Sequence, residues 1–300
     1  MAKQIDLDFR CISIDVEEYF QIETVYDVIG PDRWDEWPSR VVEQVDVLLE
    51  LFDGYGQKGT FFILGSVAQK HGGMVRRISD AGHEIASHGT MHDRLHRLGR
   101  RGFMEDLLRS KQILEDLCGE EVVGYRAPTF SIMRETAWAI DVLCECGFRY
   151  DSSIFPVVHN RYGVPSAPAD PYFVVGECGG ELLEVPPLTW RVGKRKLAVA
   201  GGGYFRMLPL WLMKLGLKQA SKEGRPGVLY FHPWEFDADI PRMPLGFLSR
   251  LRTYMGLSRS VGKLDQIAGS GGVWCPIRNR LEGLMAGADG RERFVLCEAD

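Results

Sequence analysis

The chain has 300 residues and a formal net charge of -5, with 45% hydrophobic and 26% charged residues, which is an ordinary globular composition. A chain this long can bury a large core without disulfide cross-links. It carries no stripe of Lys and Arg, so no nucleic-acid partner is expected, and the GKRK segment at residues 193–196 is predicted to be a solvated turn. No window of about 18 uncharged apolar residues occurs, so no membrane span is expected.

The first half of the chain alternates β-like and helix-like segments. Strands are predicted within residues 10–20, 59–65, 83–89, 121–128 and 149–155, and helices within residues 39–56, 66–82, 100–119 and 134–148. Ser39 is a candidate cap for the first helix. This order predicts an α/β fold with a parallel sheet, either doubly wound or closed as a barrel.

The second half is less regular. Residues 156–189 are rich in Pro and Gly, with strand-like pieces at 172–175 and 181–185; a helix is predicted at about 209–224 and a strand within 227–236. No linker divides the chain, so residues 1–300 are predicted to form a single catalytic domain. Its core is expected at residues 10–237, followed by a C-terminal helical elaboration and polar tail at 238–300.

The cysteines and the N-terminus bear on the compartment. The chain has seven cysteines at irregular spacing, which favours reduced thiols over a disulfide framework. The first residues, MAKQIDLDFR, contain no apolar signal-peptide region. We therefore expect a cytoplasmic protein. The sequence does not indicate its oligomeric state.

Polar residues close most of the predicted strands. In parallel α/β folds, ligands bind beyond the carboxyl ends of the strands, so these residues are candidates for a shared site. They are Asp15, Glu17 and Glu18; His88 and His92; Tyr125 and Arg126; Asp151; and His232, Trp234 and Glu235. Each has a purely structural explanation when it is taken singly.

Together these residues suit a hydrolytic metal site. Two imidazoles and a carboxylate bind Zn²⁺ or a similar divalent ion and leave positions open for water and substrate. A second carboxylate can act as general base, a nearby Arg can hold it ionised, and another His can protonate the leaving group. This is the equipment for metal-assisted hydrolysis of an amide or ester.

The sequence resembles the polysaccharide deacetylases, the fourth carbohydrate esterase family, from about Cys11 to Asp237. The resemblance is carried by ISIDVEEYF, GTFFILG, AGHEIASHGTMH, YRAPTFS, YDSSIFP and VLYFHPWEF, in the family's order. DVEEYF together with FHPWEF resembles the subgroup found in bacterial exopolysaccharide loci that encode exosortase-type sorting systems. The resemblance implies a distorted (β/α) barrel of about seven strands and a divalent metal, most commonly Zn²⁺, with Co²⁺ or Mn²⁺ as alternatives.

The resemblance also implies roles for individual residues. Asp15 matches the general base, Arg126 the residue that positions it, and His232 the general acid. Asp151 matches the carboxylate that tunes the acid, and the backbone N–H of Thr129 an oxyanion contact. His88 and His92 match the metal-binding histidines. Tyr125, Trp190 and Trp234 are assigned to substrate binding.

The chain departs from the common family pattern at one position. Most members have two adjacent aspartates, a base and then a metal ligand, but here Val16 follows Asp15. Some members place the second acid two residues after the first, where this chain has Glu17. Residues two apart share one face of a strand, so Asp15 and Glu17 could reach the same metal. Glu18 points the other way in a regular strand and is expected to be structural.

The leading hypothesis is a metal-dependent N-deacetylase acting on N-acetylamino sugars of a bacterial exopolysaccharide or its precursor. A second hypothesis is an amidohydrolase for a small cyclic amide, as in the allantoinase-like branch of the family. A deep closed pocket would favour this second hypothesis, and an open groove lined by aromatics such as Trp190 and Trp234 would favour sugars. A third is a sugar-binding pseudoenzyme, against which the complete set of site residues argues.

Overall fold

The computed structural model describes residues 9–193 and 195–298. Its centre is a sheet of nine strands in the order β10-β1-β2-β3-β4-β5-β7-β6-β11. The first seven of these run parallel, which agrees with the predicted number: β10 (Gly227–Phe231), β1 (Arg10–Val16), β2 (Thr60–Ile63), β3 (Glu84–Ser87), β4 (Gly124–Tyr125), β5 (Tyr150–Asp151) and β7 (Glu181–Glu184). The fold is the predicted α/β, distorted (β/α) barrel.

Two strands extend the sheet beyond β7. β6 (Tyr172–Val175) pairs antiparallel with β7, and β11 (Phe294–Val295) pairs parallel with β6. The C-terminal segment was expected to end in a polar tail, yet β11 lies inside it and joins the main sheet. A separate hairpin is formed by β8 (Thr189–Val192) and β9 (Arg195–Ala198).

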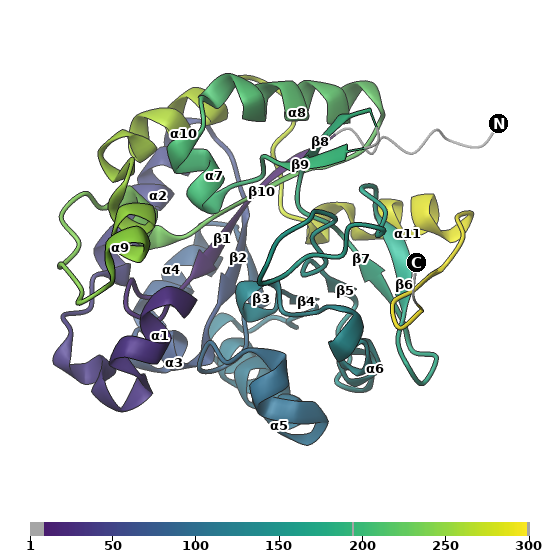
Figure 1. Cartoon of the computed structure of the whole chain (residues 1–300), viewed down its shortest axis with the longest axis horizontal. Coiled ribbons are helices and arrows are strands. Elements are labelled where there is room, and N and C mark those ends of the chain that lie inside the picture. Colours follow the sequence, from purple (N-terminus) through teal and green to yellow (C-terminus); the bar gives the residue numbers. More distant parts are fainter. Residues whose placement is uncertain (1–8, 194, 299–300) are drawn as a thin grey trace.

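Helices surround the strands, as Figure 1 shows: α8 and α10 lie on one side, and α5 and α6 lie on the opposite side. In the first half they are α1 (Glu23–Ile29), α2 (Val41–Gly54), α3 (Gly65–Lys70), α4 (Gly72–Asp80), α5 (Leu95–Cys118) and α6 (Trp138–Glu145). In the second half they are α7 (Gly202–Met207), α8 (Leu210–Lys222), α9 (Phe247–Tyr254), α10 (Ser260–Ala268) and α11 (Leu281–Asp289). The described residues contain no helix that is long and apolar enough to cross a membrane.

The helix predicted at residues 39–56 forms as α2, because Val41, Val45, Leu48 and Phe52 recur on one buried face. Ser39 does not cap it, so that expectation was wrong. Its hydroxyl donates instead to the carboxylate of Glu18, which also accepts the backbone N–H of Arg40, 3.1 Å away. Glu18 therefore satisfies the first turn of α2 from another part of the chain.

The loops beyond the carboxyl ends of the strands have an apolar cluster of their own. Tyr19, Phe20 and Trp34 from the first loop pack with Trp234 and Met243 from the segment after β10. This cluster joins residues more than 200 positions apart in sequence. It gives the polar side chains at the strand ends a rigid support.

Candidate active site and metal centre

Five parallel strands bring polar side chains to the same end of the sheet. Asp15 lies on β1, which pairs with both β10 and β2, while Arg126 and His232 come directly after β4 and β10. These strand ends open into a pocket of about 520 Å³, which is within the size range of small-molecule sites. Of the predicted site residues, those that line it are Asp15, Glu17, His88, His92, Thr129, His232 and Trp234.

Three of these residues form a cluster that could hold a metal ion. One side-chain atom each from Glu17, His88 and His92 lies within 4.8 Å of the other two, and all three residues are buried. Nε2 of His92 is 2.7 Å from Oε2 of Glu17. A carboxylate and two imidazoles at this spacing leave room for water and substrate on a four-coordinate ion.

The hydrogen bonds around the cluster suit a metal. Nδ1 of His88 donates to the carbonyl oxygen of Arg126 at 2.8 Å, so Nε2 keeps its lone pair for an ion. Burial lowers the pKa of His88 to about 4, which keeps the ring neutral. The indole N–H of Trp234 donates to Oε1 of Glu17 at 3.1 Å, while Oε2 of Glu17 faces Nε2 of His92. Such outer contacts are typical of metal ligands.

The charge of Glu17 also suits a metal ligand. Burial by itself would raise its pKa, but the neighbouring His92 and His232 outweigh that effect and lower the pKa to about 2. The side chain is therefore an anion at neutral pH. Glu18 is engaged with α2 and takes no part in the cluster, as expected from strand alternation.

The backbone around His88 and His92 is tightly turned. Gly89 has φ +79°, and a Cβ there would lie 2.9 Å from the carboxylate of Asp106 on α5. Both oxygens of that carboxylate accept the backbone N–H of Thr90, at 3.1 Å. His92 itself has φ +59°, a left-handed conformation that is costly for a residue with a side chain and is often found at functional sites. The glycine after the strand thus lets the loop place both histidines in one cluster.

Asp15 lies beside the cluster and is held by Arg126. Nη1 of the fully buried Arg126 donates to Oδ1 of Asp15 and to the hydroxyl of Ser13, each at 2.7 Å. The rest of the guanidinium is fixed by Ser152, whose carbonyl and hydroxyl oxygens accept at 3.0 and 2.9 Å, and by the ring of Phe62, 4.1 Å below it. The contact predicted between Arg126 and Asp15 is present, and Oδ2 of Asp15 faces the pocket on the side of His232.

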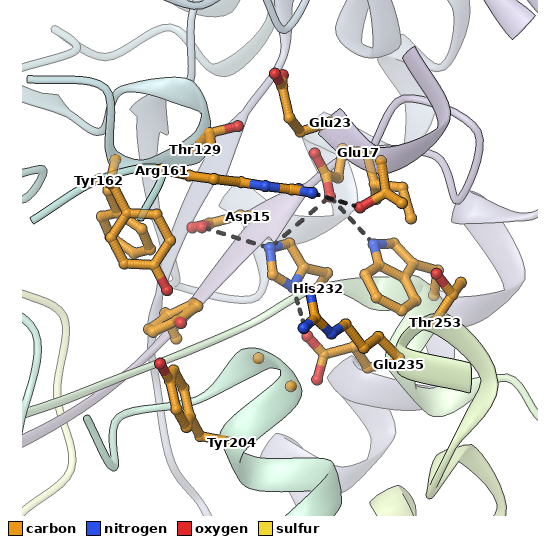
Figure 2. Close-up of a pocket in the computed structure, with 18 of the residues that line it drawn as sticks. Asp15, Glu17, Glu23, Thr129, Arg161, Tyr162, Tyr204, His232, Glu235 and Thr253 are labelled. Atoms are coloured by element: carbon orange, nitrogen blue, oxygen red, sulfur yellow. Dashed lines mark hydrogen bonds and ion pairs between the residues drawn. The ribbon is translucent and has the colours of Figure 1, made fainter. Parts of the chain in front are cut away.

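His232 faces these acids from the opposite wall, as Figure 2 shows. Its Nε2 is 3.9 Å from Oδ2 of Asp15 and 3.8 Å from Oε1 of Glu17. Its Nδ1 is 2.5 Å from Oε1 of Glu235. Burial by itself would lower the pKa of His232, but Glu17, Glu235 and Asp15 raise it to about 9. The ring is therefore protonated at neutral pH.

The carboxylate beside His232 is Glu235, not Asp151, and this corrects the assignment of Asp151. Asp151 is fully buried on β5, where it accepts a hydrogen bond from Ser153 and pairs with Glu184 of β7. Burial raises the pKa of Asp151 to about 6 and that of Glu184 well above its ordinary value. The pair holds a proton and supports the 152–153 turn beneath Arg126.

Two of the three residues assigned to substrate binding lie elsewhere. Tyr125 is buried, with its ring against Phe103 and Phe148. Trp190, on β8, lines a separate hollow on the far side of Tyr204. Trp234 does line the pocket, where its ring stacks on His232 with centroids 5.4 Å apart. The aromatic wall expected from Trp190 is formed instead by Tyr162, Tyr204 and Tyr230.

Thr129 lines the pocket where it was expected, just after Pro128. Thr129 and Phe130 are both left-handed, with φ +56° and +52°. The ring of Phe130 packs against Tyr230, with centroids 4.8 Å apart. This contact holds the strained turn against β10.

Sequence reasoning gave no role to several residues of the site. Glu235 could have been assigned from its position three residues after His232, in a Pro-started helical turn where such residues share a face. Asp106 and the pocket residues Arg161, Tyr204 and Arg252 have no motif that would have indicated them, because only the fold brings them to this end of the sheet.

Two family models match the chain. Residues 33–150 match the model described as polysaccharide deacetylase, and residues 152–281 match one described as a domain of unknown function (DUF3473). Both segments contribute strands to the same sheet. Glu235 and the pocket residues 159–162 and 202–204 lie in the second segment, whereas His88, His92 and Arg126 lie in the first.

Curated relatives are similar over part of the chain. The peptidoglycan deacetylase of Helicobacter pylori is 31% identical over 127 residues, 42% of this chain and 39% of that protein. The chitooligosaccharide deacetylase of Sinorhizobium fredii is 30% identical over 112 residues, 37% of this chain and 48% of that protein. The matches thus span less than half of these relatives' length.

Solved structures are similar over nearly the whole chain. A protein named "putative polysaccharide deacetylase" from Mycobacterium smegmatis matches with a TM-score of 0.64 and 22% identity, covering 98% of this chain and 96% of that one. Puue allantoinase matches with a TM-score of 0.53 and 16% identity, covering 93% and 89%. These likenesses show the fold.

Proposed function

The chain belongs to the polysaccharide deacetylase family, and from this premise we propose that it is a metal-dependent hydrolase that removes N-acetyl groups from N-acetylamino sugars. One observation carries the proposal. The cluster of Glu17, His88 and His92 lies in the same pocket as a carboxylate and an imidazole that can act as base and acid. The carboxylate is Asp15, which is bound to Arg126, and the imidazole is His232, which is bound to Glu235.

The ion would be held by Glu17, His88 and His92, and Zn²⁺ is the ion that this donor set suits best, with Co²⁺ or Mn²⁺ as alternatives. When bound, such an ion supplies Lewis acidity toward the acetamide oxygen and lowers the pKa of a water. Trp234 orients the Glu17 carboxylate by its hydrogen bond to Oε1. The Arg126 carbonyl orients the His88 ring in the same way.

Asp15 acts as the general base in this proposal. The hydrogen bond from Arg126 occupies Oδ1 and leaves Oδ2 to accept a proton from the attacking water. As the water oxygen bonds to the acetamide carbon, charge develops on the carbonyl oxygen, and the backbone N–H of Thr129 is placed in the pocket wall to donate to it. Freezing Thr129 in a left-handed conformation beforehand avoids reorganisation during the reaction.

His232 acts as the general acid. When the carbon–nitrogen bond breaks, the departing sugar nitrogen takes the proton from Nε2, and acetate and a free amine result. Glu235 keeps the ring protonated and oriented through Nδ1. Asp151, which the resemblance assigned to this task, acts instead on the turn that carries Ser152 and hence on Arg126.

The open side of the pocket favours a sugar over a small cyclic amide. Arg161 and Arg252, which line its outer part, are exposed to solvent, so a longer substrate can extend past them. Bacterial exopolysaccharide or its precursor is our proposed substrate, on the combination of DVEEYF and FHPWEF in the sequence. Cytoplasmic action remains a prediction from the irregular cysteine spacing.

Acetate release tests the proposal. The purified protein is assayed on N-acetylated oligosaccharides and on allantoin, before and after chelation, and with Zn²⁺, Co²⁺ or Mn²⁺ added back. We expect release from the oligosaccharides that stops on chelation and returns with metal. Full turnover in metal-free protein would overturn the mechanism. Turnover of allantoin alone would favour the cyclic-amide alternative, and sugar binding without any turnover the pseudoenzyme alternative.

A further inference from the structure

The charges that line the pocket are not evenly matched. All four of its acidic side chains have a cationic or histidine partner. The pairs are Asp15 with Arg126 at 2.7 Å, Glu17 with His92 at 2.7 Å, Glu235 with His232 at 2.5 Å, and Glu23 with Arg94 at 3.4 Å and Arg97 at 3.5 Å. Each carboxylate of the pocket is therefore already paired with a cationic group or a histidine.

Two arginines of the same pocket have no such partner. Within residues 9–193 and 195–298, neither Arg161 nor Arg252 makes an ion pair, and the hydrogen bond of the Arg161 guanidinium goes to the neutral hydroxyl of Thr24 at 3.4 Å. Arg206 differs from them, because it donates to the carbonyl oxygens of residues 252 and 253 and lies 3.5 Å from Glu235. The guanidinium group of Arg206 is therefore already bound by other groups of the protein.

Arg161 and Arg252 line the same pocket. His159 also lines the pocket, and its ring stacks on Tyr162 with centroids 3.9 Å apart. Burial and then the positive charges of Arg161 and Arg252 lower the pKa of His159. Figure 2 shows Arg161 extended into the pocket toward the side that carries Glu17.

We propose that Arg161 and Arg252 form an anion-binding subsite, so that the natural substrate carries a carboxylate or phosphate next to its N-acetylated sugar. The inference rests on the proposed function and names its substrate class. Guanidinium groups pair with both anions through two parallel hydrogen bonds. The protein as a whole has a net charge of -5, so an acidic substrate would gain no general attraction from the surface. A local pair of unmatched arginines is the feature that would bind it.

Three probes that share an N-acetylglucosamine test the subsite: neutral chitotetraose, a tetrasaccharide of alternating N-acetylglucosamine and glucuronate, and UDP-N-acetylglucosamine. The second carries carboxylates and the third a diphosphate, so they separate the two sources of negative charge. The variants are Arg161→Ala and Arg252→Ala. Arg250→Ala is the matched control, because Arg250 is an exposed arginine of the same helix as Arg252 and does not line the pocket.

At least one acidic probe is expected to have a KM about tenfold or more below that of chitotetraose. Each subsite variant should raise the KM for that probe by about tenfold, the ratio expected for one charge-assisted hydrogen bond. Its kcat should change little, since the lost contact binds ground state and transition state alike. Arg250→Ala should leave both values unchanged.

Calorimetry on metal-depleted protein, where no turnover is expected, keeps this test separate from that of the proposed function. Tighter binding of an acidic probe that is lost in both subsite variants supports the subsite even if no probe is deacetylated. Equal affinity for acidic and neutral probes overturns it, and this result leaves deacetylation of chitotetraose untouched. Equal losses in Arg250→Ala would also overturn it, because the effect would then come from general surface charge.

Discussion

Replacing Glu235 with Gln should move the pH dependence of turnover without abolishing it. Glutamine has nearly the same shape and keeps an oxygen that can accept from Nδ1 of His232. It removes the negative charge that now lies 2.5 Å from that nitrogen. Arg206 keeps its hydrogen bonds to the carbonyl oxygens of residues 252 and 253, and its guanidinium stays over the ring of Trp234, 4.9 Å from the centroid. The fold should therefore persist.

The size of the effect follows from the charges around His232. A unit charge at about 4 Å in a medium of effective dielectric constant near 20 is worth about 4 kcal/mol, and one pKa unit corresponds to about 1.4 kcal/mol. This sets a scale of about three pKa units for one neighbouring charge. The pKa of His232 is raised to about 9 by Glu17, Glu235 and Asp15 together, so the share of Glu235 should be about one to two units.

Turnover needs Asp15 ionised and His232 protonated, so its pH profile should be bell-shaped. The alkaline limb reports loss of the proton from His232. Because the Gln variant lowers the pKa of His232, this limb should move to lower pH by about one to two units. Activity near pH 8 should fall about two- to tenfold, while activity on the acidic side of the new limb should fall much less.

The assay is the rate of acetate release against pH for the wild-type protein and Glu235→Gln, with Glu18→Gln as a control for loss of a buried carboxylate outside the pocket. A structural defect would lower activity by the same factor at every pH. If the alkaline limbs of Glu235→Gln and the wild type coincide, Glu235 does not set the protonation of His232. The general acid would then have to be reassigned.

Three further predictions concern single side chains. His232→Ala should lose roughly two to four orders of magnitude in turnover, the usual contribution of a general acid–base group, yet keep its metal; near-normal turnover would mean that another residue is the acid. Gly89→Ala should lose about 1–3 kcal/mol of stability in denaturant unfolding, because alanine at φ +79° is strained and its Cβ meets Asp106. Gly73→Ala, in an open helical position, should not be destabilising, and equal effects of the two would refute the strain argument. Glu184→Ala should cost about 1–3 kcal/mol by removing one of the hydrogen bonds to the buried Asp151, whereas Glu184→Gln, which can still donate to Asp151, should cost much less; equal losses would show that the shared proton is unimportant.

The sequence was sufficient to predict the elements and the inner part of the site. The alternation of apolar runs and amphipathic helices predicted a parallel sheet, and polar residues at the strand ends predicted a shared pocket. The number of about seven strands was implied by the family resemblance. Asp15, Glu17 and His88 follow from that rule, because the carboxyl ends of parallel strands meet at one edge. The alternation of side chains along a strand was enough to predict that Glu17, and not Glu18, faces the site.

The outer part of the site could not be predicted in this way. Tyr125 lies on β4, but its ring is buried against Phe103 and Phe148. Trp190 lies on β8 of the separate hairpin and lines another hollow. The resemblance assigned Asp151 to tune the general acid, but in the structure Asp151 pairs with Glu184 and does not contact His232. Arg161 lies on an irregular segment and Arg252 on α9, and no strand-end pattern relates either residue to the pocket that it faces.

Metal content measured as atoms per chain in matched variants tests the central claim most directly. Glu17→Ala removes the carboxylate of the proposed cluster, Asp15→Asn removes the proposed base with almost no change of shape, and Glu18→Gln changes the adjacent acid that caps α2. The account predicts about one divalent ion per chain in the wild type, Glu18→Gln and Asp15→Asn, little in Glu17→Ala, and loss of turnover in Asp15→Asn despite its metal. A metal-free Asp15→Asn together with a fully loaded Glu17→Ala would contradict it, because the two carboxylates would then have each other's roles.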